Sequence, residues 1–210
     1  MKPGYFISLE GGEGAGKTTQ IEYLKAAIEA AGVEVVTTRE PGGSAVGEAI
    51  RHLLLDRALP AMHPDTELLM MFAARAEHVH RVIKPALAAG RWVISSRFTD
   101  ASFVYQGAGR GVAPERLQAL ADWTLEGFQP DLTFVLDLPV DTGMARVLAR
   151  GAVDRFEAES VAFFERVREG YLRRVEAEPH RVKRIDATES VARVTENIME
   201  HLRAWLSPTT

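Results

Sequence analysis

The chain has 210 residues, 46% hydrophobic and 26% charged, a balance typical of a folded globular protein. The formal net charge of −4 argues against a nucleic-acid partner, because a broad basic surface is not expected. The absence of cysteine excludes disulfides and a thiolate zinc site. The length fits a single domain over residues 1–210, and without a long apolar run or a signal peptide we expect a cytoplasmic protein with no membrane partner.

Short apolar runs alternate with helical patterns along the chain. The predicted strands cover residues 5–9, 33–38, 92–95, 132–137 and 181–185. The predicted helices cover residues 17–31, 44–56, 64–89, 99–108, 114–126, 141–150, 157–176 and the segment after 190, with a loop at 151–154. Pro85 removes one backbone donor and predicts a kink in the third helix. This alternation predicts an α/β fold of three layers, in which a parallel five-stranded sheet carries helices on both faces.

A glycine-rich segment follows the first predicted strand and opens the first predicted helix. It fits the pattern G-x-x-x-x-G-K-[ST] and consists of Gly11, Gly12, Glu13, Gly14, Ala15, Gly16, Lys17 and Thr18. Glycines let backbone N–H groups converge on a phosphate, and the helix directs its positive end at the same point. Lys17 can pair with the β- and γ-phosphates of ATP, and the Thr18 hydroxyl can ligate Mg²⁺. The segment therefore predicts a nucleotide phosphate site.

The phosphate loop alone does not separate kinases from GTPases or motor ATPases. Guanine-specific proteins usually carry N-K-x-D, and Asn197 is the only asparagine of this chain, so that motif is absent. Ligands of parallel sheets bind at the carboxyl ends of the strands, where Arg39, Glu40, Ser96 and Arg97 are expected. Several arginines around one site suit a reaction that brings two phosphorylated molecules together.

Four segments together resemble the thymidylate kinase family, in its bacterial type with a basic lid. They are Phe6–Gly11, Arg39–Gly43, Phe72–Arg75 and Tyr105–Arg110. The resemblance spans nearly the whole chain and implies a P-loop fold with a short lid at about residues 143–157. It also implies phosphorylation of dTMP to dTDP with ATP and Mg²⁺, in dTTP synthesis, by a homodimer.

The same resemblance implies how dTMP is held. Arg51 and Arg97 match the residues that bind the acceptor phosphate, and Arg75 matches the residue that bonds the thymine carbonyl. A guanidinium group can bind two phosphate oxygens at once through two parallel hydrogen bonds. Without the resemblance, Arg51 is read as an exposed helix charge. The full implied set of dTMP-binding residues is Glu40, Arg51, Met71, Phe72, Arg75, Arg97, Ser102, Tyr105 and Gln106.

Met71 stands where the family usually places the aromatic residue that stacks on the base, four residues before Arg75. Phe72 lies three residues before Arg75, and both positions share its helical face. The base could therefore stack on Phe72 or slide over the polarisable Met71. The alternative is that both residues belong to the core.

The catalytic residues implied by the resemblance are Lys17, Arg97, Arg150 and Glu13. In the bacterial type the lid supplies a basic residue to the transferring phosphate and the phosphate loop carries an acidic one, a pattern matched by Arg150 and Glu13. The implied lid residues are Arg146, Arg150 and Arg155. A solvated basic helix is the alternative for Arg146.

The third predicted strand ends in Ser96-Arg97-Phe98, whereas the family usually has an aspartate at the first of these positions. Either Thr18, with Ser96 or Glu40 acting through water, suffices to hold the metal, or the chain is weakened as a catalyst. Two other functions therefore stay open beside dTMP phosphorylation. One is another nucleotide or nucleoside kinase, and the other is a weakly active ATP-binding switch.

Overall fold

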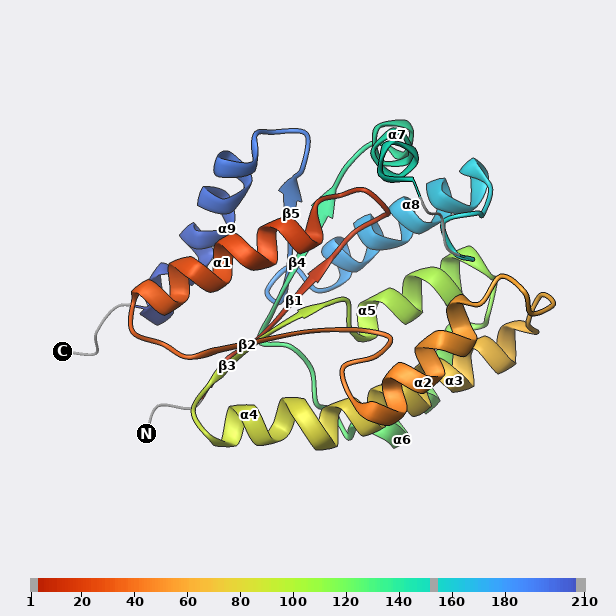
Figure 1. Cartoon of the computed structure of the whole chain (residues 1–210), viewed down its shortest axis with the longest axis horizontal. Helices are drawn as coiled ribbons and strands as arrows, with labels where there is room; N and C mark the ends of the chain where they lie inside the picture. The colour runs from red at the N-terminus through yellow and green to blue at the C-terminus, as the bar shows by residue number, and fades with distance from the viewer. Residues whose placement is uncertain (1–3, 152–154, 207–210) are drawn as a thin grey trace.

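The computed structural model describes residues 4–151 and 155–206, and the predicted loop and lid residues 152–154 lie outside this part. The described residues contain one parallel sheet in the order β2-β3-β1-β4-β5 (Figure 1). Its strands are β1 (Phe6–Glu10), β2 (Val35–Arg39), β3 (Trp92–Ser96), β4 (Leu132–Asp137) and β5 (Val182–Asp186). The predicted five-stranded parallel sheet is therefore confirmed, with small shifts at the strand ends.

The helices lie on both faces of this sheet (Figure 1). They are α1 (Lys17–Ala30), α2 (Ala45–Leu55), α3 (Pro64–His78), α4 (Lys84–Ala88), α5 (Thr99–Ser102), α6 (Pro114–Leu125), α7 (Val140–Arg150), α8 (Val161–Ala177) and α9 (Val191–Leu206). Wider, π-helical turns form η1 (Val79–Ile83) and η2 (Phe103–Gly109). No helix in the described residues is long and apolar enough to cross a membrane.

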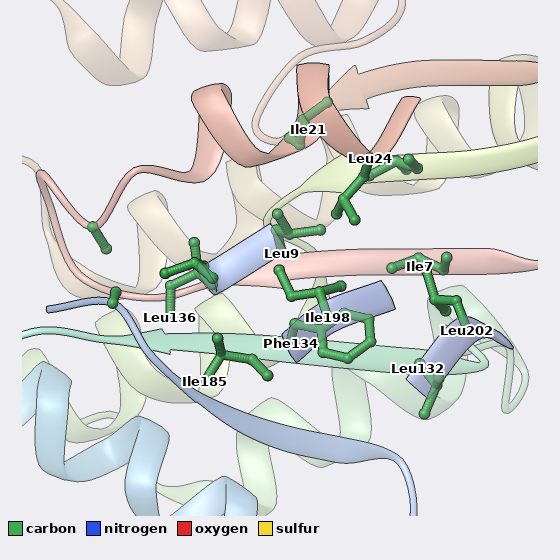
Figure 2. Close-up of a cluster of buried hydrophobic side chains, with 14 of the residues drawn as sticks. Ile7, Leu9, Ile21, Leu24, Leu132, Phe134, Leu136, Ile185, Ile198 and Leu202 are labelled. Carbon is green, nitrogen blue, oxygen red and sulfur yellow. The ribbon is translucent and has the colours of Figure 1, made fainter. Parts of the chain in front are cut away.

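Side-chain alternation along the strands divides the core between the two faces. Ile7 and Leu9 of β1 point with Phe134 of β4 toward α1 and α9, where Leu24 and Ile198 cover them (Figure 2). All five side chains are fully buried. This apolar packing holds α1, and with it the glycine-rich loop, against the middle of the sheet.

The opposite face carries the remaining helices. Phe6 of β1 packs with Phe72 of α3 and Ile83 of η1 in one buried cluster. Val135 of β4 packs with Tyr171 of α8 in another. Of these elements, α3 also carries the predicted acceptor-site residues Met71, Phe72 and Arg75, so the core fixes their positions.

Two helices differ from their predicted bounds, one at a proline and one at a capping serine. The long helix predicted over 64–89 changes to the π-helical η1 directly before Pro85, which lacks the N–H that an α-helical turn would use. The helix predicted from residue 157 begins at Val161, because Ser160 caps it and accepts the N–H of Phe163 at 3.2 Å.

Glu10, the last residue of β1, is fully buried beneath the site. Its carboxylate accepts the N–H of Phe98 at 2.6 Å and the hydroxyl of Tyr171 at 2.8 Å. Burial raises the pKa of Glu10 from 4.5 to about 7, and the Asp100 carboxylate acts in the same direction. Because the unfolded chain loses this proton first, the ionisation of Glu10 costs folding stability as the pH rises from about 4.5 to about 7.

We expect Glu10→Gln to stabilise the protein relative to wild type at pH 8 by about 1–3 kcal/mol more than at pH 5. The amide can accept from Phe98 and donate to Tyr171, so the bonding pattern survives. Urea unfolding at the two pH values measures the difference. Glu22→Gln, on the exposed side of α1, is the matched control, and an effect of Glu10→Gln that is equal at both pH values would contradict the account.

Candidate active site

The glycine-rich loop lies between β1 and α1, at the carboxyl edge of the sheet. Gly16 adopts φ 89°, a left-handed conformation that glycine allows, and α1 begins at the next residue. The Lys17 amine is folded over the loop and donates to the carbonyls of Gly11 at 3.0 Å and Gly12 at 2.7 Å. Burial and the charge of Arg97 lower the pKa of Lys17 to about 7. Within the part of the chain that the structure describes, the Lys17 amine contacts only backbone carbonyls, which an anion at the loop can replace.

The loop also packs on α7, the helix that leads toward the predicted lid. A Cβ atom at Gly14 would lie 2.2 Å from the carbonyl oxygen of Gly143, so this close approach requires a glycine. Arg146 of the same helix donates to the Gly14 carbonyl at 3.3 Å. The predicted lid residue Arg146 therefore touches the loop backbone.

An open cavity of about 540 Å³ lies beside the loop. Residues from the loop, the ends of β2 and β3, and helices α2, α3, α5 and η2 line it. The predicted site residues that it brings together are Glu13, Glu40, Arg51, Met71, Arg75, Arg97, Ser102, Tyr105 and Gln106. The structure therefore gathers side chains separated by long stretches of sequence into one concave site next to the phosphate loop.

Arg75 is held rigidly at the wall of this cavity. Its Nε donates to Glu40 at 2.7 Å and one Nη to the carbonyl of Phe98 at 3.1 Å, while its guanidinium lies 4.7 Å from the Phe72 ring centre. Among the described residues, its other nitrogen, Nη1, is one of the few buried side-chain polar atoms without a partner. His78 contacts the second oxygen of Glu40 at 2.9 Å, so both oxygens of this carboxylate are engaged.

Met71 and Phe72 have different positions although they are neighbours on α3. Met71 lines the cavity. Phe72 is 1% exposed, belongs to the core cluster beneath Arg75 and does not line the cavity. The geometry therefore separates the two candidates for contact with a base.

Arg97 connects the cavity to the phosphate loop. It adopts φ 69°, an uncommon conformation for a residue with a side chain, directly after β3. Its guanidinium forms an ion pair with Glu13 and donates to the Tyr105 hydroxyl at 2.9 Å. Burial acts to raise the pKa of Glu13, but the charges of Arg97 and Lys17 outweigh it and lower the pKa, so the carboxylate stays ionised.

The remaining predicted arginines surround the same region. Arg51 lines the cavity and donates to the carbonyl of Pro41 at 2.8 Å. Arg150 forms an ion pair with Glu157, and its own side chain is 63% exposed. Arg155 donates to Glu67 of α3 at 2.7 Å and to the Leu54 carbonyl, also at 2.7 Å. The structure thus places Arg155 behind the cavity wall and leaves Arg150 near the surface.

Glu67, His78 and Phe156 take part in the site but were not identified from the sequence. His78 holds Glu40, and Phe156 lines the cavity. Glu67 is 1% exposed and accepts from Gln106 at 2.9 Å. Spacing alone could have pointed to His78, which lies three residues after Arg75 on one helix face.

The predicted metal ligands do not gather in one place as the phosphate-binding groups do. Thr18 is exposed at the start of α1, and Ser96 is partly exposed at the end of β3. No cluster of three or more His, Asp or Glu side chains that could hold a metal occurs in residues 4–151 and 155–206. A cation at this site would therefore need ligands from a bound nucleotide.

These features define a P-loop nucleotide kinase: a parallel sheet delivers a phosphate loop from its middle strand, beside a cavity lined by arginines. The Thymidylate kinase family profile matches residues 9–198. The chain is 50% identical over 207 residues to the thymidylate kinase of Methylococcus capsulatus, with 99% of both chains covered. It is 52% identical over 200 residues to that of Nitrosomonas europaea, covering 95% of this chain and 93% of the relative.

A solved structure agrees with this assignment. The thymidylate kinase of Ehrlichia chaffeensis superposes with a TM-score of 0.76 at 33% identity, covering 96% of this chain and 99% of the other. The chain belongs to the thymidylate kinase family.

Proposed function

We propose that the protein transfers the γ-phosphoryl group of ATP to the 5′-phosphate of dTMP, giving dTDP. The observation that carries the proposal is the position of Arg97, which lines the acceptor cavity and pairs with Glu13 of the phosphate loop. A phosphate bound by Arg97 therefore lies next to the phosphates of a nucleotide in the loop. The acceptor phosphate is itself the nucleophile, so the protein needs mainly to position and to neutralise charge.

The cavity can hold dTMP through groups at its two ends. Arg51 and Arg97 would bind the 5′-phosphate, because guanidinium groups suit phosphate oxygens. Arg75 would donate to a carbonyl of the base from Nη1, which has no hydrogen-bond partner in residues 4–151 and 155–206. Met71 would cover the face of the ring, and Tyr105 would crowd the 2′ position of the sugar.

The phosphate loop would hold ATP. Lys17 would exchange its bonds to the carbonyls of Gly11 and Gly12 for the β- and γ-phosphates. Arg150 is the basic residue that α7 would supply to the transferring phosphoryl group, because its exposed side chain is free to turn from Glu157 toward the loop. Mg²⁺, when bound, neutralises charge on the phosphates; Thr18 would contribute a hydroxyl and the nucleotide the other oxygens.

We also propose a homodimer, formed through the side of the molecule that carries α3 and α6. Leu69 of α3 is 54% exposed, and Trp123 of α6 is 78% exposed. Covering large apolar side chains of this kind favours association. Sedimentation equilibrium is expected to give twice the chain mass, and a monomer at micromolar concentration would remove the proposal.

Coupled measurement of ADP release with a panel of nucleoside monophosphates tests the proposed reaction. We expect dTMP to give the highest kcat/KM, with dCMP, dAMP and dGMP much poorer. Equal rates with all acceptors would indicate a broad nucleotide kinase. Release that does not depend on any acceptor would indicate an ATPase or a switch.

Met71→Ala is expected to raise the KM for dTMP by about tenfold with a smaller change in kcat, because it removes a contact that is similar in the ground and transition states. Phe72→Ala is the matched comparison: it is expected to lower the free energy of unfolding by about 3–5 kcal/mol, since Phe72 is buried in the core. Steady-state kinetics and urea unfolding of both variants check this division. If neither variant changes the affinity for dTMP, both residues are excluded as contacts of the base.

A further inference from the structure

Glu67 is a buried carboxylate one layer behind the acceptor cavity. It lies in the first turn of α3, is 1% exposed and does not line the cavity itself. Its Oε1 accepts from the amide nitrogen of Gln106 at 2.9 Å, and its Oε2 accepts from Arg155 at 2.7 Å. Arg110 approaches both oxygens, at 3.3 and 3.4 Å. The ion pairs with Arg155 and Arg110 compensate for the burial of the Glu67 carboxylate.

This contact fixes the orientation of the Gln106 amide. An ionised carboxylate can only accept hydrogen bonds, so the NH₂ group of Gln106, and not its carbonyl, must face Glu67. Gln106 also lines the cavity and is itself 1% exposed. Its carbonyl oxygen is therefore left as the group that can serve a ligand in the cavity.

Arg75 supplies the opposite type of group in the same cavity. Glu40 and the Phe98 carbonyl hold two of its nitrogens, and Nη1 is a buried donor that has no partner among the described residues. An arginine cannot become an acceptor at any ordinary pH. The cavity thus presents one fixed donor, at Arg75, and one acceptor whose direction depends on Glu67.

We propose that Glu67 is a positioning residue that sets the base selectivity of the enzyme. With Gln106 fixed, the donor and the acceptor match a pyrimidine that has a carbonyl at C4 and an N–H at N3, as in thymine and uracil. Cytosine carries an amino group at C4 and a bare nitrogen at N3, so both contacts become mismatched and leave buried polar groups unpaired. This inference rests on the proposed function, because it assumes that the cavity binds a pyrimidine nucleotide.

Glu67→Gln tests the proposal, because a glutamine at position 67 can both donate and accept. The Gln106 amide can then turn and present NH₂ to the bare N3 of cytosine, which repairs one of the two mismatched contacts. We expect the ratio of kcat/KM for dTMP to that for dCMP to fall by about 10- to 100-fold. The ratio for dTMP to dUMP should stay unchanged, because these bases share the edge that Gln106 would read. A general structural defect would not lower one ratio and spare the other.

Glu159→Gln is the matched control, since Glu159 pairs with Arg110 at 2.6 Å in the same cluster and has no bond to Gln106. It should leave both ratios at wild-type values. The exchanged pair Glu67→Gln/Gln106→Glu should recover the dTMP preference, because a carboxylate at position 106 can only accept from the base. If Glu67→Gln does not fold, as judged by thermal melting, the exchanged pair alone decides: a retained preference supports the proposal and a lost one overturns it.

An unchanged dTMP to dCMP ratio in folded Glu67→Gln would overturn the role of Glu67, and so would an equal loss in Glu159→Gln. Neither result would touch the proposed function, which requires that the wild-type enzyme phosphorylates dTMP in preference to other acceptors. A wild-type enzyme without preference for dTMP over dCMP would instead refute the acceptor assignment itself.

Discussion

Lys17→Met is expected to lower kcat for dTMP phosphorylation by about a thousandfold while leaving the fold intact. The Lys17 amine is the cation of the phosphate loop. Removing one preorganised charged group that contacts a transferring phosphoryl group typically lowers kcat by two to three orders of magnitude. Methionine fills similar space. Because the folded pKa of Lys17, about 7, lies below its ordinary value of 10.5, its charge costs folding stability below about pH 7, and the cost fades as the pH rises.

The substitution should therefore keep or raise the melting temperature at neutral pH while activity is lost. Saturating-substrate kinetics and thermal melting of the same preparation measure both quantities. Lys25→Met is the matched control, since Lys25 is a surface residue of α1 that pairs with Glu29. More than a tenth of the wild-type rate in Lys17→Met would contradict the role given to the loop.

Arg97→Ala is the second substitution with a large expected effect, a fall of about a thousandfold in kcat/KM for dTMP. The variant removes the cation that lines the cavity and pairs with Glu13, so the acceptor phosphate loses its contact and the two phosphates repel each other more strongly. Arg97→Lys keeps the charge and the backbone strain at φ 69° but lacks the planar fork. In Arg97→Lys, kcat/KM for dTMP should therefore fall by about 10- to 100-fold.

Determination of kcat and KM separately for dTMP distinguishes positioning from simple binding. We expect both parameters to worsen in Arg97→Ala, because Arg97 acts on the ground state and on the transition state. Arg116→Ala, which removes a 61% exposed arginine paired with Asp65, should leave both unchanged. A change of only a few fold in KM, with kcat retained, would show that Arg97 is not placed at the reacting phosphates.

Most of the fold follows from local sequence patterns. Short apolar runs predict the strands, and the helices predicted to start at residue 44 and after residue 190 begin at Ala45 and Val191. The π-helical η1 and η2 could not be predicted in this way. Apolar spacing does not distinguish an α-helical turn from a slightly wider one, and the wider turn depends on how the segment packs.

The candidate site was predicted in outline because its residues lie at strand ends or within recognisable segments. The distinction between Met71 and Phe72 required the structure, since adjacent residues on a helix differ in burial only once its neighbours are placed. The partnerships of Glu67 with Gln106 and of Glu40 with Arg75 join residues far apart in sequence. No local pattern reports such pairs, so the second layer of the site becomes visible only in three dimensions.

The fate of the γ-phosphoryl group tests the central claim most directly. Incubation of the enzyme with ATP labelled at the γ-phosphate, Mg²⁺ and dTMP, followed by separation of the products, should place the label in dTDP in equal amount to the ADP formed. Label found mainly as inorganic phosphate, or transferred only when another acceptor replaces dTMP, would contradict the account.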